Sequence, residues 1–406
     1  MQIKLFSFSN IYIFLWLVYS LQTFIFGGAG SVYSLAIILF LIGVSLYYLA
    51  FALTHYKMPA YMKGLSVLLA MFTFYGVLLI LQSTTHKTYL GEVIPNYRYI
   101  YNILISLLPI FAFYVFTRQG KINEVTFKRW VFVFFVCVTL QYFQHYQQQL
   151  QEALEMGSSR EEFTNNFGYE FLSMIPLMAF FSKRKWIQYA GLAYIMVFLL
   201  MAMKRGAILV GGICVAWFLF RSFRKASRKQ KIGVIVLSIV LVLAGIYTFI
   251  YLENNSDFFI TRIENTLEGN SSGRDDIYTS AINAFLNESN PILVLVGHGA
   301  YSSLNIMGQF AHNDWLEIAI CQGILGVVIY LFYWRGFYKS TKSARFDEEL
   351  FMAMSLLLIS NFVRSFFSMS YGDMSIYATM CLGYCMGKIS EHNDMIRKVY
   401  HISDNK

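Results

Sequence analysis

Long apolar runs alternate with short polar connections along almost the whole chain. A transmembrane helix needs about 20 mostly apolar residues to cross about 30 Å of hydrocarbon. The pattern therefore predicts roughly twelve transmembrane helices. These cover residues 10–27, 32–54, 64–84, 99–117, 130–146, 166–182, 186–203, 206–220, 232–252, 316–334, 350–368 and 374–387.

Composition agrees with this interpretation. Of the 406 residues, 57% are hydrophobic and 14% are charged, and the mean hydropathy is +0.51, values unlike those of soluble proteins. We therefore expect an all-α polytopic membrane protein. Its expected parts are helices 1–9 in residues 1–252, a large extracytoplasmic loop in 253–315, helices 10–12 in 316–390 and a cytoplasmic tail in 391–406. The first apolar run is longer than the core of a signal peptide, so we interpret it as a retained helix.

The distribution of positive charge predicts the topology. Of the 32 lysine and arginine residues, 24 fall in alternate connections and at the two termini. Cytoplasmic loops are enriched in Lys and Arg, so this side is predicted to be cytoplasmic. The net charge of +9 is thus a topology signal, and we expect no nucleic acid partner. The five cysteines lie in apolar runs, where they predict neither disulfides nor a metal site.

The longest connection, about Glu253 to Phe310, shows signs of order. Apolar residues at helical spacing predict an amphipathic helix from about Asp275 to Leu286, which Asn290 and Pro291 end. A short apolar segment then leads to Gly297-His-Gly-Ala300, a turn of the kind that lets backbones approach closely.

Arg274 is an exception in this acidic loop. It falls just before the predicted helix, where the helix dipole disfavours a cation unless an anion is bound there. A phosphate ligand would explain its position. A salt bridge with Asp275, Asp276 or Glu268 would explain it equally well.

Three further cations oppose the topology bias. Lys204 and Arg205 stand at the external end of the seventh span, where charges are costly unless they are paired or functional. Their alternative role is to reach lipid headgroups. Arg364, near the external end of the eleventh span, is better explained by packing or by the same headgroup contact.

Polar residues crowd the start of the tenth span. Asn313 and Asp314 are suited to capping that helix, but capping does not need the preceding His312. A structural histidine at the membrane edge and a catalytic one are both consistent with this position. His298, between two glycines, is interpreted first as a turn residue.

Several chemistries are excluded by missing motifs. The sequence has no Walker loop, no Gly-x-Gly-x-x-Gly after a strand, no Gly-x-Ser-x-Gly elbow and no His-Glu-x-x-His helix. It also lacks an Asp-x-Asp pair that would hold a metal on a nucleotide sugar.

The remaining motifs resemble a known superfamily. In order, they are Lys204-Arg205-Gly206-Ala207, Ser272-Gly-Arg274, Val296-Gly-His-Gly-Ala300, His312-Asn-Asp-Trp-Leu316 and Gly323-Ile-Leu-Gly326. With about twelve spans and a large loop before the last three, the chain resembles the bacterial O-antigen ligase/polymerase superfamily, which includes the Wzy polysaccharide polymerases and the WaaL ligases. The architecture matches over the whole chain, while the motifs lie within about residues 204–326.

The resemblance implies a membrane glycosyltransferase of the GT-C kind that needs no metal or cofactor. It would take a glycan from undecaprenyl diphosphate and transfer it to an acceptor hydroxyl. By resemblance, Arg205 and Arg274 would hold the donor diphosphate, and His312 would be the catalytic residue, oriented by Asn313 or Asp314. The candidate supporting residues are Lys204, Asn313, Asp314, Arg364 and His298. The serine usual before the Lys204-Arg205 pair is replaced.

The resemblance also implies partners and a location. The partners are the undecaprenyl-diphosphate-linked oligosaccharide, an acceptor glycan and membrane lipids, with chain-length regulator and flippase proteins as candidates. The location is the bacterial inner membrane, with both termini cytoplasmic. A polymerase is favoured because His-Asn-Asp-Trp-Leu and a Gly-x-x-Gly open the tenth span, and a ligase that transfers glycan to lipid A-core is the alternative. A transporter would usually show inverted repeats, and a scaffold would leave the external arginines unexplained.

Overall fold

The computed structural model describes residues 7–26, 31–82, 85–88, 91, 93–155, 165–255, 260–261, 264 and 273–403. Most of these residues are helical. The first elements are α1 (Phe8–Ser20), α2 (Gln22–Phe26), α3 (Val32–His55), α4 (Ala60–Leu81), α5 (Tyr97–Leu107), α6 (Pro109–Arg118), α7 (Glu124–Glu155), α8 (Gly168–Met174), the 3-10 helix η1 (Ile175–Phe181) and α9 (Lys185–Met201). The remainder are α10 (Arg205–Lys225), α11 (Arg228–Asn255), α13 (Arg274–Leu286), α14 (Pro291–Val296), α15 (Ser302–Met307), α16 (Asp314–Ser343), the 3-10 helix η2 (Ala344–Phe346), α17 (Glu348–Arg364) and α18 (Ile376–Ser403).

The helices make the chain an all-α polytopic membrane protein. Among the described residues, seven helical segments are long and apolar enough to cross a membrane. They are Val32–His55, Ala60–Leu81, Tyr97–Arg118, Glu124–Gln151, Arg205–Lys225, Gln230–Asn254 and Asp314–Phe346. All twelve predicted runs fall on helical segments, but the other five lie on helices that are shorter or less apolar.

Proline explains two interruptions of the predicted spans. Pro109 begins α6 immediately after α5, and Pro176 lies at the start of η1 after α8. Proline has no backbone N–H and its ring crowds the preceding turn, so it begins a helical piece more readily than it continues one. The runs 99–117 and 166–182 are therefore each built from two helical pieces.

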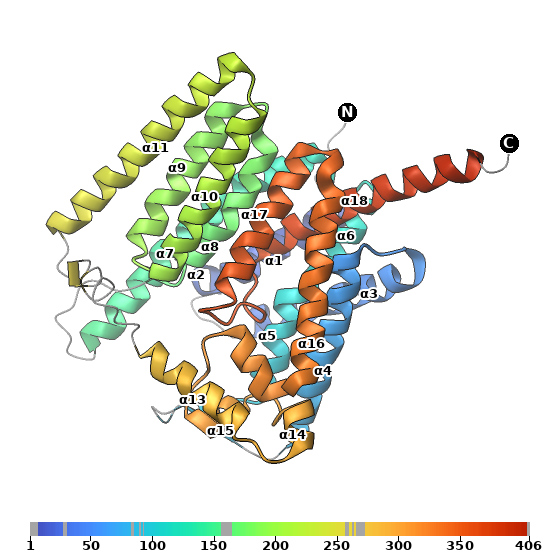
Figure 1. The fold of residues 1–406 in the computed structure, drawn as a ribbon, viewed down its shortest axis with the longest axis vertical. Helices are drawn as coiled ribbons and strands as arrows, with labels where there is room; N and C mark the ends of the chain where they lie inside the picture. The colour runs from blue at the N-terminus through green and yellow to red at the C-terminus, as the bar shows by residue number, and fades with distance from the viewer. Residues whose placement is uncertain are drawn as a thin grey trace.

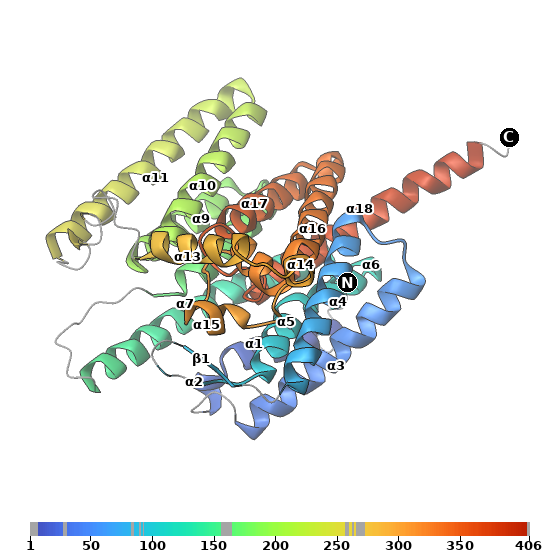
Figure 2. The ribbon, with the colours of Figure 1, turned by 60° about the horizontal axis from the view of Figure 1, so that its bottom comes forward.

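The helices pack so that segments far apart in the sequence lie side by side. In the described bundle α4 packs along α16, α6 along α18 and α10 along α17. Figure 1 shows α13, α14 and α15 together at one end, and α11 at one edge against α9 and α10 in both views (Figures 1 and 2). The C-terminal part of α18 projects from the side of the bundle opposite α11 (Figure 1). Residues 391–403, expected to form a tail, continue this helix.

The turn Gly297–Gly299 touches the backbone of α16. Its N–H groups donate to the carbonyls of Ile320 and Cys321 at 3.0 and 2.9 Å. Gly323 interrupts the helix there with φ 66° and ψ −163°, a conformation that favours glycine. A Cβ on Gly323 would lie 2.5 Å from the backbone nitrogen of Gly297. The close approach expected from the glycine turn is therefore present.

Alanine at Gly323 is expected to destabilise the protein strongly. The backbone strain costs about 1–3 kcal/mol, and pushing the two backbones apart costs a similar amount. In detergent, Gly323→Ala should lower the Tm by several degrees or remove the monodisperse peak in size-exclusion chromatography. Gly212→Ala in α10 is the matched control, because its Cβ would meet nothing within 4 Å. Equal stability of the two variants would contradict this packing.

A short hairpin between α4 and α5 was not predicted. Strand β1 (His86–Lys87) pairs antiparallel with β2 (Val93–Ile94), and His86 lies opposite Ile94. Two-residue strands are too short to show the alternation that reveals a strand in a sequence. The His86 ring lies 5.9 Å from that of Tyr301, centroid to centroid, so the hairpin contacts the segment that leads into α15.

Candidate functional site

Six helix ends meet at the face of the bundle where α13 lies. The starts of α8, α10, α13 and α16 and the ends of α9 and α17 come together there. Antiparallel neighbours bring alternate ends to one face, so distant parts of the sequence can supply one site. The other end of α10, at Lys225, lies about 30 Å away, given a rise of 1.5 Å per residue.

The turn between α9 and α10 carries Lys204 and Arg205. Lys204 is the N-cap of α10 without a side-chain cap bond, Arg205 is its first residue, and both are half-buried. Met203 before them has φ 50°, a left-handed conformation that is costly for a residue other than glycine. Just before α8 in the chain, the Asn165 backbone N–H donates to the carbonyl of Ala202 at 2.9 Å. Backbone geometry therefore fixes the two cations at this face.

Gly206 lets two aromatic rings approach the start of α10. A Cβ at Gly206 would lie 2.5 Å from the Tyr169 hydroxyl and 2.8 Å from a ring carbon of Phe367. Tyr169 belongs to α8, and Phe367 follows α17. A side chain at Gly206 would push both elements away from the two cations.

Arg274 is the first residue of α13 and is half-buried. Within the described residues it forms no ion pair, so the alternative salt bridges to Asp275 and Asp276 are not formed. Glu268 and Ser272 lie outside the described residues. Arg274 therefore holds its position at the helix start without a carboxylate partner from this part of the chain.

Tyr278 anchors α13 to the end of α17. One turn along the helix from Arg274, its hydroxyl donates to the carbonyl of Phe366 at 3.0 Å. The side-chain amide of Asn313 donates to the same carbonyl at 2.9 Å. Burial raises the pKa of Tyr278, and the nearby charge of Arg274 opposes that rise. Arg274, Tyr278 and Asn313 are thus neighbours.

His312 lies between α15 and α16, with an exposed side chain. Neither ring nitrogen forms a hydrogen bond with a described residue. Burial of part of the ring lowers the pKa of His312, and the positive charges of Arg274 and Lys204 lower it further. Both cations must lie within electrostatic range of the imidazole to do so. The structure therefore brings Lys204, Arg274 and His312 together, and we call these three residues the His312 cluster.

Backbone strain coincides with this cluster. Among the described residues, three other than glycine have a positive φ, and two of them are Met203 (φ 50°) and His312 (φ 50°). Such conformations persist only where the surrounding structure enforces them, and they gather at functional sites. His312 belongs to the cluster, and Met203 directly precedes its member Lys204.

Asn313 and Asp314 fasten the start of α16, and neither orients the imidazole. The side-chain Oδ1 of Asn313 caps the helix by accepting from the N–H groups of Trp315 and Leu316. Asp314 is fully buried. Its carboxylate accepts from the Ser370 N–H at 2.7 Å and from the Ser370 hydroxyl, and from the Tyr330 hydroxyl at 2.7 Å. The expected capping by Asn313 is confirmed, whereas the expectation that Asn313 or Asp314 would orient His312 is wrong, because both side chains are already bonded elsewhere.

Removing the Asp314 carboxylate should cost stability. Asp314→Ala leaves the Ser370 N–H and hydroxyl and the Tyr330 hydroxyl without their acceptor, and each buried unsatisfied group costs about 1–3 kcal/mol. We expect a Tm in detergent lower by several degrees. Asp276→Ala, on the exposed first turn of α13, should change the free energy of unfolding by less than about 1 kcal/mol. A stable but inactive Asp314→Ala protein would instead indicate a catalytic role for this carboxylate.

Arg364 is buried at the end of α17. Its guanidinium forms an ion pair with the exposed carboxylate of Asp373 and stacks over the Tyr169 ring, with Cζ 4.2 Å from the centroid. This is the packing role favoured for Arg364. Because Tyr169 also contacts the start of α10, Arg364 supports the turn that carries Lys204.

His298 lies apart from the cluster. Its Nε2 is 3.0 Å from Oε2 of Glu288, which follows the C-terminal end of α13. Arg274 stands at the other end of this 13-residue helix, about 20 Å away. The arrangement agrees with the interpretation of His298 as a turn residue.

Three residues near the cluster were not singled out from the sequence. Tyr278 follows Arg274 by four residues, so helical periodicity places both on one face. Glu170 is an acid inside an apolar run, which is itself a functional signal, and it lies within electrostatic range of Arg364 and Asp373. Tyr169 carries no such signal, because a tyrosine is common at the end of a span.

Fold and site together define a polytopic α-helical membrane protein with cations and a histidine gathered at one face. Among the described residues, no group of three His, Cys, Asp or Glu side chains could hold a metal ion. Residues 190–331 match the family described as O-antigen ligase. This match confirms the resemblance to the O-antigen ligase/polymerase superfamily, and the matched segment contains the whole His312 cluster. No curated protein matches the chain.

Proposed function

We propose that the protein is a glycosyltransferase that polymerises undecaprenyl-diphosphate-linked oligosaccharide repeat units into O-antigen, capsular or exopolysaccharide at the outer face of the cytoplasmic membrane. The observation that carries the proposal is the meeting of Lys204, Arg274 and the weakly basic His312 from three separate parts of the chain. The superfamily match over residues 190–331 supports the same class of substrate, a lipid-linked glycan.

The cations would bind the diphosphate of the donor. Arg274 and Arg205 have guanidinium groups that can hold phosphate oxygens through two parallel charge-assisted hydrogen bonds. Lys204, which directly precedes Arg205, adds a point charge within electrostatic range of His312. Neutralising the diphosphate makes it a better leaving group, so the donor bond can break without a proton from a general acid.

His312 would accept the proton of the acceptor hydroxyl. The acceptor oxygen forms a bond to the anomeric carbon of the donor sugar while the bond from that carbon to the diphosphate oxygen breaks. The hydroxyl proton passes to the imidazole, and the lipid diphosphate leaves with the electron pair. A histidine is suited to this role because its lowered pKa keeps it neutral at pH 7.

A ligase is the second candidate, favoured by the description of the matching family, which is O-antigen ligase. A ligase would use the same donor site but transfer the finished glycan to lipid A-core. The two activities differ only in the acceptor, so the donor-binding residues would be common to both.

A deletion strain distinguishes the two activities. Loss of a polymerase leaves single repeat units on the lipid A-core, whereas loss of a ligase leaves no glycan on it. We expect single units, seen as one band above the core in a gel of lipopolysaccharide. A bare core would overturn the polymerase proposal in favour of the ligase.

A purified system tests the contrasting hypothesis, which is that the protein is a transporter. Protein in detergent, with no closed membrane, should elongate lipid-linked repeat units. Failure to do so, together with movement of lipid-linked sugars across reconstituted vesicles, would favour a transporter.

The proposed topology places the His312 cluster at the outer face of the cytoplasmic membrane. The opposite end of the bundle carries the cation-rich connections, such as residues 183–185 and 221–231, and such connections are cytoplasmic in membrane proteins. Both termini would then be cytoplasmic. The acceptor glycan would approach from the outer face, where chain-length regulator and flippase proteins are candidate partners.

A further inference from the structure

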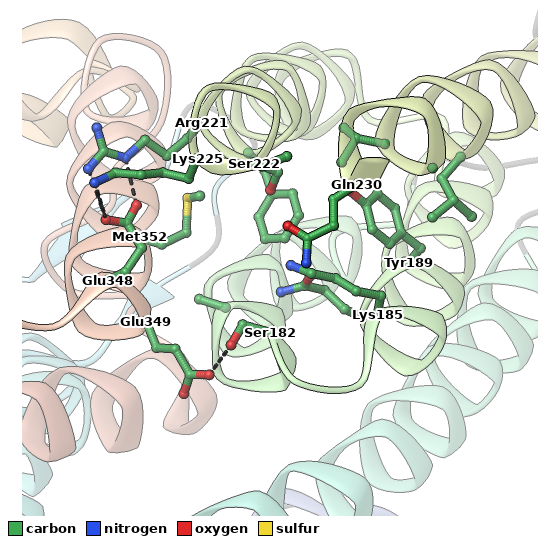
Figure 3. Close-up of a pocket in the computed structure, with 17 residues that line it drawn as sticks. Ser182, Lys185, Tyr189, Arg221, Ser222, Lys225, Gln230, Glu348, Glu349 and Met352 are labelled. Carbon is green, nitrogen blue, oxygen red and sulfur yellow. Dashed lines mark hydrogen bonds and ion pairs between the residues drawn. The ribbon is translucent and has the colours of Figure 1, made fainter. Parts of the chain in front are cut away.

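A second polar site lies at the opposite end of α10. A cavity of about 310 Å³ is lined by residues of η1, α9, α10, α11 and α17 and by the connections beside them, and Figure 3 shows its charged and polar side chains. It lies about 30 Å from the His312 cluster along α10. The proposed glycosyl transfer does not involve this cavity.

Positive charge is in excess in this cavity. Its lining contains Lys185, Arg221 and Lys225 against the carboxylates of Glu348 and Glu349. Arg221 and Lys225 both bind Glu348, with nitrogen to oxygen distances of 2.7 and 3.5 Å (Figure 3). Lys185 forms no ion pair with a described residue, although the Glu349 carboxylate lies within electrostatic range of it. The Lys185 ammonium can therefore still pair directly with an anion.

Further polar groups line the cavity together with Lys185. Its Nζ donates to the Gln188 side chain at 3.2 Å, and the Ser182 hydroxyl donates to Glu349 (Figure 3). The Tyr189 hydroxyl is buried without a hydrogen bond of good geometry, although the Ser222 hydroxyl lies close by. A buried hydroxyl of this kind usually has a partner. A ligand oxygen in the cavity could supply it.

Apolar side chains continue the cavity toward the middle of the bundle. Phe218 lies one turn inside Arg221 on α10, and Val234 and Leu237 extend along α11 from its polar start. A cavity with charged groups at the helix ends and apolar walls beyond them fits a molecule with a charged head and an apolar chain. A free phosphate ion would contact only the first part.

We propose that this cavity binds the phosphate group of an anionic phospholipid. Lys185 would contact the phosphate, Tyr189 would donate to one of its oxygens, and the apolar walls on α10 and α11 would hold the upper part of an acyl chain. Basic pockets between transmembrane helices on the cytoplasmic side bind acidic lipid headgroups in this way. The site is separate from the proposed catalytic one, and its test needs no glycan.

Thermal unfolding of the full-length protein in detergent micelles tests the proposal. We expect added phosphatidylglycerol to raise the Tm in a saturable way, while phosphatidylcholine and inorganic phosphate leave it unchanged. Lys185→Gln should weaken the apparent affinity about tenfold, because it removes a hydrogen bond to a charged group. Tyr189→Phe, which keeps the ring packing, should cause a smaller loss of affinity.

Arg224→Gln is the matched control. Arg224 lies at the same end of α10, is exposed and does not line the cavity, so this variant should bind phosphatidylglycerol as the wild type does. Equal binding by wild type, Lys185→Gln and Tyr189→Phe would overturn the proposal. An equal Tm rise with phosphatidylcholine or with inorganic phosphate would also overturn it, since neither requires a site for an anionic lipid.

Discussion

The Arg274→Ala variant is expected to remain folded and to make almost no polymer. Arg274 is half-buried at the start of α13 and forms no ion pair within the described chain, so its loss leaves no buried carboxylate unpaired. Removing one preorganised group that stabilises developing negative charge typically costs about 100-fold to 1000-fold in rate. The measurement is elongation of a lipid-linked repeat unit by purified protein, followed on a gel.

Two further variants isolate the role of the guanidinium. Arg274→Lys keeps the charge but loses the two parallel hydrogen bonds, so an intermediate rate is expected. Arg224→Ala removes an exposed arginine about 30 Å away and should leave the rate unchanged. Polymer of normal length and amount from Arg274→Ala would remove Arg274 from the site.

Those parts of the fold that depend on a local pattern of residues, such as apolar residues at helical spacing, could be predicted from the sequence. The amphipathic helix expected at about 275–286 is α13 (Arg274–Leu286), because its apolar residues recur at helical spacing and Ile277 and Ala281 are buried. The start of η1 was less predictable, because Pro176 breaks an apolar run that otherwise looks continuous. Apolar periodicity identifies a buried segment but does not show how many helical pieces form it.

Only those features of the site that depend on residues close together in the sequence could be predicted from it. Asn313 was expected to cap α16 because the capping bonds reach only two or three residues along the chain. The partner of Asp314 is Ser370, 56 residues away, and no spacing rule reveals such a contact. Resemblance, rather than spacing, linked Arg205 and Arg274 to His312, with Lys204 as a supporting residue. The electrostatic interaction of Lys204 and Arg274 with His312 depends on six helix ends that meet only in the fold.

The His312→Ala variant is expected to lose polymer formation, and the pH profile of the wild type should identify the group. If His312 accepts the acceptor proton, it is active only when neutral. The rate should therefore be constant at neutral pH and fall as the pH drops through the pKa of His312, which burial, Arg274 and Lys204 hold below its usual value. Ordinary histidines titrate near pH 6.5. The measurement is the pH dependence of kcat/KM with purified protein.

Lys204→Gln provides the sharper test, because it changes the pKa of His312 without removing the imidazole. With one positive charge gone, protonation of the ring becomes easier, so its pKa rises and the acidic fall in rate moves to higher pH. Arg224→Gln removes an equal charge at the far end of α10 and should leave the profile where it was. A profile that shifts equally in both variants would reflect net charge alone. An acidic limb that persists in residual His312→Ala activity would assign the titration to another group.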